Sequence, residues 1–365
     1  MSHQPAPLLI RHILELAQNK DIVFSDVQLE EGQQPMLRTP MGWRSSGYEG
    51  STDADEILAF LDAFDPGAKS RLDDQQGMEE TTQFEGIRLR CSAYAINAGM
   101  SIAASVRVLP SEPPKFEETG LPASVAQFAT RPRGLLLVTG PTGSGKTTTM
   151  ASLLRMINEK RSAHVITIED PIEFVFQREQ AIFSQRQVGK DIPSFGDGLR
   201  QALRQSYDVL MIGEIRDRET AETALRAAES GRFVMASLHS RNATSAVSKM
   251  LSYFGGDAPS IAPTFANSLV GVVAQCLVPT IKGKYTLAAE ILVNDAKVTE
   301  FVADMKFQNI NGYLQQGASN SCTYMNQILM NKVVRGEISI DAAMLNSPDP
   351  NELKRQYDAA PTIRK

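Results

Sequence analysis

Residues 140 to 148 have the types and spacing of a loop that binds the phosphates of a nucleotide. They are Gly140, Pro141, Thr142, Gly143, Ser144, Gly145, Lys146, Thr147 and Thr148. The run from 140 to 147 fits the pattern G-x-x-x-x-G-K-[ST] at every fixed position. Glycines let the backbone wrap around phosphate oxygens where a Cβ would collide. Lys146 would bring a positive charge to the β- and γ-phosphates, and Thr147 would offer a hydroxyl to Mg²⁺.

Two further segments end in carboxylates where such an enzyme needs them. A β-branched run at 165–168 is followed by Glu169 and Asp170, and an apolar run at 209–212 is followed by a glycine and Glu214. The carboxyl ends of parallel strands line the nucleotide crevice of a doubly wound sheet. A carboxylate there can hold Mg²⁺, orient the attacking water or accept its proton. For Glu169 and Asp170, a solvated strand end capped by proline is the alternative.

A single histidine follows a third apolar run. His239 comes directly after residues 234–238. A lone histidine is more often a hydrogen-bonded structural residue than a functional one. At a third strand end of the same crevice, however, His239 would be placed to contact the γ-phosphate, so both interpretations stay open.

The elements that must position these side chains follow from the periodicity. The apolar run at 134–139 predicts a buried parallel strand before the loop, and helical spacing at 148–156 predicts a helix after it. Loop amides and the helix N-terminus would then converge on the phosphates. Strands and helices alternate from 134 to about 238, as in a doubly wound sheet, and the chain from there to about 344 is expected to be mostly helix.

A proline-rich segment at 110–115 predicts two domains. Upstream of it, the pattern predicts a mixed α+β domain, with helices at 7–18 and 53–64 and strands at 22–29, 35–38, 84–94 and 100–109. The expected parts are a first domain at 1–110, a linker at 111–116, a nucleotide-binding domain at 117–345 and a flexible tail at 346–365.

Composition excludes several classes of protein. The net charge of −5 over 365 residues argues against broad nucleic-acid binding. Cys91, Cys276 and Cys322 form no C-x-x-C pair, which favours a reducing compartment. No signal peptide is apparent, and the apolar stretch at 269–278 is far shorter than the roughly 20 residues that span a bilayer. We therefore expect a cytoplasmic protein that reaches the membrane only through partners.

The order of the segments resembles that of the secretion ATPase superfamily, and within it the type IV pilus retraction (PilT-like) ATPases. The matching segments are the phosphate loop at 140–148, an aspartate box at 167–174, a Walker B segment at 210–217 and a histidine box at 237–243. Segments outside this core also fit, at 25–29, 88–93, 185–189 and 274–279. The resemblance covers roughly residues 8 to 345.

The resemblance implies both a fold and an activity. The fold would be α/β, a P-loop RecA-like doubly wound parallel-sheet domain with a helical C-terminal part, preceded by a smaller α+β PAS-like domain. The activity would be ATP hydrolysis with Mg²⁺ by a homo-hexameric ring that drives pilus retraction. An inner-membrane pilus platform protein would be a partner, and a paralogous pilus ATPase is a second candidate. The ring would lie at the cytoplasmic face of the bacterial inner membrane.

The resemblance also implies roles for individual residues. Lys146 and Thr147 would hold phosphate and Mg²⁺, and Glu214 would support the Mg²⁺ site directly or through water. Glu169 is the first choice for the general base, although Glu169 and Glu214 could exchange roles. His239 would sense the γ-phosphate.

Three arginines on the predicted strands before the linker match positions where the family supplies positive charge to the nucleotide. They are Arg88, Arg90 and Arg107. An arginine that reaches the phosphates across a domain or subunit boundary stabilises charge in the transition state. A surface salt bridge is the alternative for each. Residues 112–115 would act as the hinge between the domains.

Several positions depart from the family pattern. Arg232 and Phe176 stand where histidines are frequent, and residues 206–207 replace the usual Asp-Pro. The segment 297–300 lacks the arginine of the A-I-R motif that retraction ATPases carry. These departures leave open a related secretion or conjugation system and a weakly active accessory subunit of another motor. A nucleic-acid motor is a third alternative, which the acidic balance disfavours.

Overall fold

The computed structural model describes residues 7–19, 21–50, 52–74, 76–110, 112–317 and 321–359. The chain forms two compact units, Met1–Ser111 and Glu112–Lys365. The division falls at the start of the proline-rich segment, where the missing backbone N–H groups of proline prevent both helix and sheet from continuing.

The first unit is built on a six-stranded sheet with the order β3-β2-β1-β6-β5-β4. Each neighbouring pair is antiparallel. The elements are, in chain order, α1 (Leu8–Gln18), β1 (Asp26–Glu30), β2 (Met36–Thr39), β3 (Gly42–Ser45), α2 (Ala54–Asp62), α3 (Ala68–Asp73), β4 (Met78–Phe84), β5 (Ile87–Ile96) and β6 (Ser101–Leu109). The elements β3, β4 and α3 had not been expected, whereas α1, α2, β5 and β6 lie close to their predicted ranges.

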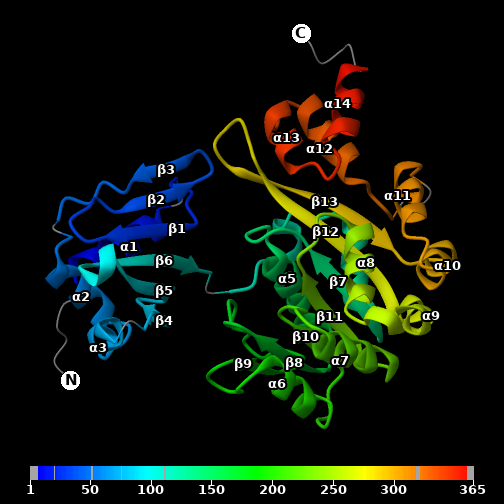
Figure 1. The fold of residues 1–365 in the computed structure, drawn as a ribbon, viewed down its shortest axis with the longest axis horizontal. Helices are drawn as coiled ribbons and strands as arrows, with labels where there is room; N and C mark the ends of the chain where they lie inside the picture. Colours follow the sequence, from blue (N-terminus) through cyan, green and yellow to red (C-terminus); the bar gives the residue numbers. More distant parts are fainter. Residues whose placement is uncertain are drawn as a thin grey trace. The chain divides into compact units, whose positions relative to one another are not determined.

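The two faces of this sheet differ in chemistry because successive strand residues point to opposite sides. Residues such as Leu89, Cys91 and Val106 pack in one buried cluster with apolar side chains of α1 and α2, among them Ile13 and Phe60. The alternating positions of β5 and β6 are only half-buried. Helices therefore cover one face of the sheet within this unit (Figure 1).

The second unit is built on a seven-stranded sheet with the order β13-β12-β7-β11-β10-β8-β9. All neighbouring pairs are parallel except β12 with β13. Its strands are β7 (Gly134–Thr139), β8 (His164–Glu169), β9 (Ile182–Gln187), β10 (Val209–Ile212), β11 (Phe233–Leu238), β12 (Leu269–Pro279) and β13 (Tyr285–Val293). Its helices of six or more residues are α5 (Lys146–Lys160), α6 (Phe195–Ala202), α7 (Arg218–Glu229), α8 (Ala243–Ser252), α9 (Ala258–Ser268), α10 (Ala296–Ala303), α11 (Gln308–Gln315), α12 (Met325–Val334), α13 (Ile340–Asn346) and α14 (Pro350–Asp358).

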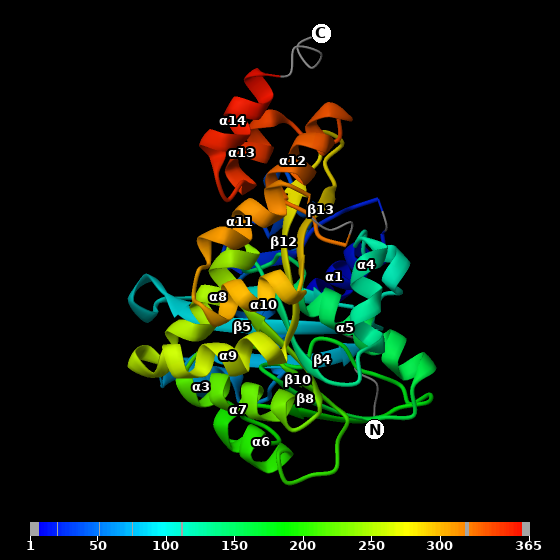
Figure 2. The same cartoon turned by 90° about the vertical axis from the view of Figure 1, so that its right-hand side faces the viewer.

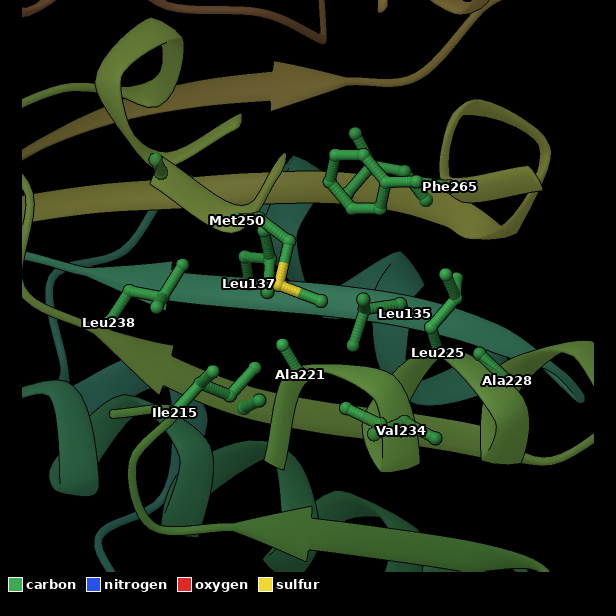
Figure 3. Packing of buried hydrophobic residues seen from close by; sticks show 14 of the residues in the cluster. Leu135, Leu137, Ile215, Ala221, Leu225, Ala228, Val234, Leu238, Met250 and Phe265 are labelled. Carbon is green, nitrogen blue, oxygen red and sulfur yellow. The ribbon is translucent and has the colours of Figure 1, made fainter. Parts of the chain in front are cut away.

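Both faces of the parallel sheet are covered, which explains why β7, β10 and β11 are buried at every residue. On one face, a cluster joins β7 and β11 to α5 through residues such as Leu136 and Leu153. On the other face, leucines of β7 and β11 meet side chains of α7, α8 and α9 (Figure 3). The labelled residues of that layer include Leu135, Leu137, Val234, Leu225, Met250 and Phe265. The doubly wound α/β class expected from the sequence is confirmed.

The expectation of mostly helix beyond residue 238 is wrong for the hairpin of β12 and β13. The apolar run at 269–278 is a strand that pairs in parallel with β7 and antiparallel with β13. A short apolar run fits a buried strand and a buried helix equally well, so periodicity could not separate the two. Figure 2 shows α12, α13 and α14 gathered at one end of this hairpin. No helix in the described part of the chain is long and apolar enough to cross a membrane.

The expected flexible tail is also wrong for Pro350–Asp358, which form α14. The side chain of Asp349 accepts a hydrogen bond from the backbone N–H of Glu352, and proline occupies the first turn, as at many helix starts. Leu353 is buried in a cluster with Leu329 of α12. One buried leucine in a polar segment gives little apolar periodicity, so composition alone favoured a tail. Residues 360–365 lie outside the described residues.

Candidate nucleotide site

The phosphate loop lies between the buried end of β7 and the start of α5. Two of its glycines meet requirements that other residues could not. Gly140 has a φ of +153°, and a Cβ there would lie 2.2 Å from the carbonyl oxygen of Gln275. Gly145 caps the start of α5 in the left-handed region, with a φ of +85°. The backbone thus turns tightly and presents the helix N-terminus to the loop interior.

The loop fits an anion. Nζ of Lys146 donates to the carbonyl oxygens of Gly140 at 2.9 Å and Pro141 at 3.1 Å. Burial lowers the pKa of Lys146, while the charges of Glu214 and Glu173 act in the opposite direction. Oγ of Ser144 is buried without a hydrogen-bond partner among the described residues. A desolvated ammonium and an unpartnered hydroxyl in one loop suit phosphate oxygens, which accept from both.

Glu214 and His239 are brought together because β10 and β11 are adjacent parallel strands, with Ile212 opposite Ala236. Nε2 of His239 lies 3.1 Å from Oε1 of Glu214. Nε of Arg216 donates to the other carboxylate oxygen at 2.7 Å. Burial is the main cause that lowers the pKa of His239, and the charge of Lys146 adds to it. Both causes favour the neutral imidazole, whereas the charge and the hydrogen bond of Glu214 act in the opposite direction.

Glu169 is the last residue of β8, and only 4% of it is exposed. Its Oε1 accepts from Oγ1 of Thr167 at 2.6 Å and from Nε2 of Gln185 at 3.3 Å. Burial raises the pKa of the Glu169 carboxyl to about 7, against the effect of these bonds and of one from the backbone N–H of Glu173. The carboxyl is thus held inside the sheet edge, and it anchors the loop that follows.

That loop carries Glu173, which was not singled out from the sequence. The carboxylates that act on Lys146 are those of Glu214 and Glu173, whereas Glu169 is not among them. Glu173 is half-buried, and Asp170 is exposed. Residues that directly end a strand are easy to find in a sequence. Glu173 stands three residues beyond Asp170, where the path of the chain decides which carboxylate acts on the lysine.

The three arginines lie on the half-buried face of the first unit's sheet. Arg90 on β5 is directly opposite Arg107 on β6. Nε of Arg107 donates to Oδ1 of Asp26 at 2.8 Å, and a second nitrogen of its guanidinium lies 2.7 Å from the same oxygen. Arg90 lies 3.8 Å from a carboxylate oxygen of Glu79. Arg88 shares this face because it stands two residues before Arg90 on β5.

The predicted Mg²⁺ ligands are Thr147 and Glu214. Within the described residues, no group of three or more histidines, cysteines and acidic residues could hold a metal ion by itself. Mg²⁺ in phosphate-transfer sites is held mainly by nucleotide oxygens and water, with one or two protein ligands. Thr147 is half-buried at the start of α5 and follows the lysine directly. The residues present therefore fit Mg²⁺ that arrives with a nucleotide.

Gln275 is a further residue that was not given a role. It belongs to the segment 274–279, which the family resemblance had already matched, and it lies buried against the phosphate loop. The sequence feature that could have pointed to a role for Gln275 is its position as a polar residue inside the apolar run at 269–278.

Comparison with known proteins identifies a family for this chain. The model of the family described as "Type II/IV secretion system protein" matches residues 61–355. A twitching motility protein of Neisseria gonorrhoeae is 38% identical over 274 residues, which cover 74% of this chain and 73% of the relative. The type IV pilus ATPase PilU of Pseudomonas aeruginosa is 34% identical over 66% of this chain and 64% of its own length.

Solved structures include one with the same architecture over nearly the whole chain. The crystal structure of the pilus retraction motor PilT with bound ADP is 34% identical and has a TM-score of 0.82. The similarity covers 97% of this chain and all of that one. That structure shows a nucleotide bound to a protein of this fold.

Proposed function

Because the chain belongs to the type II/IV secretion system protein family and is an ATP-binding motor of that family, we propose that it powers the retraction of a type IV pilus. The observation that carries the chemistry is the grouping of Lys146, Glu173, Glu214 and His239 around one phosphate loop. The likeness to PilT over 97% of the chain supports the pilus role.

The residues divide the work of ATP hydrolysis. The loop from Gly140 to Thr148 and the ammonium of Lys146 bind the phosphates. Thr147 and Glu214 hold Mg²⁺, which neutralises charge on the phosphates when bound. His239 responds to the γ-phosphate through its contact with Glu214, because any change in that carboxylate changes the partner of the imidazole.

We infer that Glu173, rather than Glu169, is the general base. A general base must reach the attacking water within hydrogen-bond distance. Glu173 is half-buried on the loop that follows β8, and its charge acts to raise the pKa of Lys146. The carboxyl of Glu169 is occupied by Thr167 and Gln185. Glu169 would then act indirectly, by anchoring the backbone of Glu173.

The arginines would supply positive charge to the nucleotide across a domain or subunit boundary. Arg90 is a stronger candidate than Arg107, because Arg107 is bound to the buried carboxylate of Asp26, whereas Arg90 lies 3.8 Å from the largely exposed Glu79. A guanidinium in this position stabilises the charge that develops on the phosphates during transfer.

The assembly that fits this function is a cytoplasmic homo-hexamer at the inner face of the inner membrane. Its partner would be a pilus platform protein of that membrane, and a paralogous pilus ATPase could act beside it. No role for nucleic acid is proposed, because the net charge is −5.

One observation favours a second candidate. The helix α10 reads Ala-Lys-Val-Thr-Glu-Phe-Val-Ala and lacks the A-I-R arginine of retraction motors. A related secretion or conjugation system would not need that arginine. An accessory subunit that acts with another pilus ATPase would not need it either. Both alternatives keep the nucleotide site. The secretion or conjugation motor would hydrolyse ATP by itself, whereas the accessory subunit would be weakly active without its partner.

The first test is Mg²⁺-dependent ATP hydrolysis by the purified chain, with its assembly state measured in parallel. We expect hydrolysis by a hexamer, lost in both Lys146→Ala and Glu214→Ala. A folded hexamer without hydrolysis would overturn the autonomous motor and favour the accessory subunit. In cells, the Lys146→Ala chain should fail to support pilus retraction, whereas full retraction with that variant would contradict the motor role.

A further inference from the structure

A glutamine in the middle of an apolar strand contacts the phosphate loop directly. Gln275 lies on β12 with 2% of its surface exposed. The neighbouring residue Ala274 is paired with Thr139, the last residue of β7. The parallel pairing of β12 with β7 therefore brings Gln275 beside the point where the phosphate loop begins.

Both ends of the Gln275 carboxamide are hydrogen-bonded to the phosphate-binding segment. Nε2 donates to the carbonyl oxygen of Ser144 at 2.7 Å. Oε1 accepts from Oγ1 of Thr149, in the first turn of α5, at 2.8 Å. Thr149 is itself buried. An apolar side chain could fill the same space, so these two bonds are what distinguish glutamine at this position.

The bond to Ser144 restrains a part of the loop that would otherwise turn freely. Gly143 and Gly145 flank Ser144, with φ values of +77° and +85°. A peptide group next to a glycine can rotate at lower steric cost than one between larger residues. Because the peptide is planar and trans, its carbonyl and its N–H point in opposite directions. Fixing the Ser144 carbonyl toward β12 therefore directs the N–H of Gly145 away from β12.

We propose that Gln275 is a positioning residue of the ATPase site, which holds the phosphate loop and the first turn of α5 in the conformation that binds nucleotide. Its two bonds fix the Ser144–Gly145 peptide and the start of the helix before nucleotide arrives. Binding to a loop that is already ordered loses less conformational entropy than binding to a loop that the ligand must order. Without Gln275, nucleotide affinity should fall although every phosphate-binding residue is still present.

The chain offers a matched control in Asn158, near the other end of α5. Asn158 is also a buried carboxamide, with 3% of its surface exposed. Its Nδ2 donates to the carbonyl of Gln177 at 2.7 Å, and its Oδ1 accepts from the backbone N–H of Glu179 at 3.1 Å. It therefore matches Gln275 in burial and in its hydrogen bonds, but it lies away from the loop.

The experiment compares Gln275→Met with Asn158→Leu in the full chain. The measurements are the equilibrium dissociation constant for ADP, KM and kcat for ATP, and the melting temperature without nucleotide. We expect Gln275→Met to raise the dissociation constant and KM about tenfold, which corresponds to about 1.4 kcal/mol. Asn158→Leu should lower the melting temperature about as much as Gln275→Met does. It should leave the ADP dissociation constant within about twofold of wild type.

The outcomes separate positioning from a purely structural role. Wild-type affinity in Gln275→Met, or equal loss in both variants, would overturn the proposal. If Gln275→Met does not fold, Thr149→Val removes one of the two bonds with little change of shape. About a threefold rise in the ADP dissociation constant then supports the proposal, and no rise overturns it.

The inference rests on nucleotide binding by the loop and not on the pilus role. A wild-type chain that binds no ADP would remove the nucleotide site itself, and with it this inference. A wild-type chain that binds ADP but does not act on pili would overturn only the proposed function.

Discussion

Nε2 of His239 lies 3.1 Å from Oε1 of Glu214, so that the ends of two adjacent strands share one polar contact. The other oxygen of Glu214 is bound by Arg216. The carboxylate is thus held from two sides within electrostatic range of Lys146. An event at the phosphates that draws Glu214 toward Mg²⁺ or nucleotide would weaken its contact with His239. We therefore propose that this pair transmits the state of the nucleotide to the protein.

We expect His239→Asn to lower kcat at least tenfold while the affinity for ADP changes less than threefold. The reason is that His239 contacts Glu214 and not the phosphate loop, and ADP lacks the γ-phosphate. Steady-state hydrolysis and ADP titration measure the two effects. His164 is the control, because it also contacts a polar side chain, with its Nε2 2.9 Å from Oγ of Ser184. It lies at the amino end of β8, whereas His239 follows the carboxyl end of the parallel strand β11. Equal losses in His239→Asn and His164→Asn would contradict the assignment.

Glu173→Gln should lower kcat by about 10²- to 10⁴-fold, the range that a general base contributes. Glu169→Gln should lower kcat less than tenfold, since a glutamine oxygen can still accept from Thr167 and Gln185. Single-turnover hydrolysis at saturating ATP separates this effect from binding. If Glu169→Gln abolishes hydrolysis and Glu173→Gln does not, Glu169 is the base after all.

The phosphate loop could be predicted from sequence because its residue types form a local pattern. Its glycines, lysine and threonine follow one another at fixed spacing, and the strand before them is buried throughout. Gln275 could not be assigned in the same way. Its partners Ser144 and Thr149 lie more than a hundred residues earlier, and the contact depends on β12 pairing with β7.

The choice of general base and the structure of the C-terminal part also depend on contacts between segments that are distant in the sequence. The strand that ends in Glu169 was predictable, but the burial of its carboxyl depends on β9, which supplies Gln185. The hairpin of β12 and β13 is stabilised by pairing with β7, and the helix α14 by packing against α12. Neither partner can be found in a local window of sequence.

A pH effect on stability is expected from Glu290 on β13, which is fully buried. Its two oxygens accept from the backbone N–H of Ala243 at 2.8 Å and of Met325 at 3.1 Å, at the starts of α8 and α12. Burial raises the pKa of this carboxyl from 4.5 to about 7, and the charge of Glu352 adds to the rise. The folded state therefore holds the proton to a higher pH than the unfolded state does.

Because the pKa of Glu290 is higher in the folded state than in the unfolded state, the protonated carboxyl favours folding. Stability from this group is fully present below about pH 4.5, and it is lost as the pH rises to about 7. We expect Glu290→Gln to reduce the loss of unfolding free energy between pH 5 and pH 8 by up to about 3 kcal/mol. Denaturant unfolding of both proteins at the two pH values measures it. Glu300→Gln, at an exposed position, should leave the loss unchanged, and an unchanged loss in Glu290→Gln would contradict the prediction.

The last prediction separates Arg107 from Arg90 in the first unit. Asp26 is 6% exposed, and its Oδ2 has no hydrogen-bond partner among the described residues. Arg107→Ala would leave this carboxylate without its ion pair and should lower the stability of the unit by about 1–3 kcal/mol. Arg90 lies 3.8 Å from Glu79, which is largely exposed, so Arg90→Ala should cost less than about 1 kcal/mol.

Their effects on catalysis should be reversed. Arg90→Ala should lower kcat tenfold or more if its guanidinium reaches the nucleotide. The double change Arg107→Ala with Asp26→Ala should recover most of the stability and retain at least half of wild-type hydrolysis, because the buried charge is then gone. Unfolding measurements and steady-state hydrolysis of the same preparations check both statements. If the double variant is stable yet loses hydrolysis while Arg90→Ala retains it, then Arg107 acts on the nucleotide and Arg90 has only a surface contact.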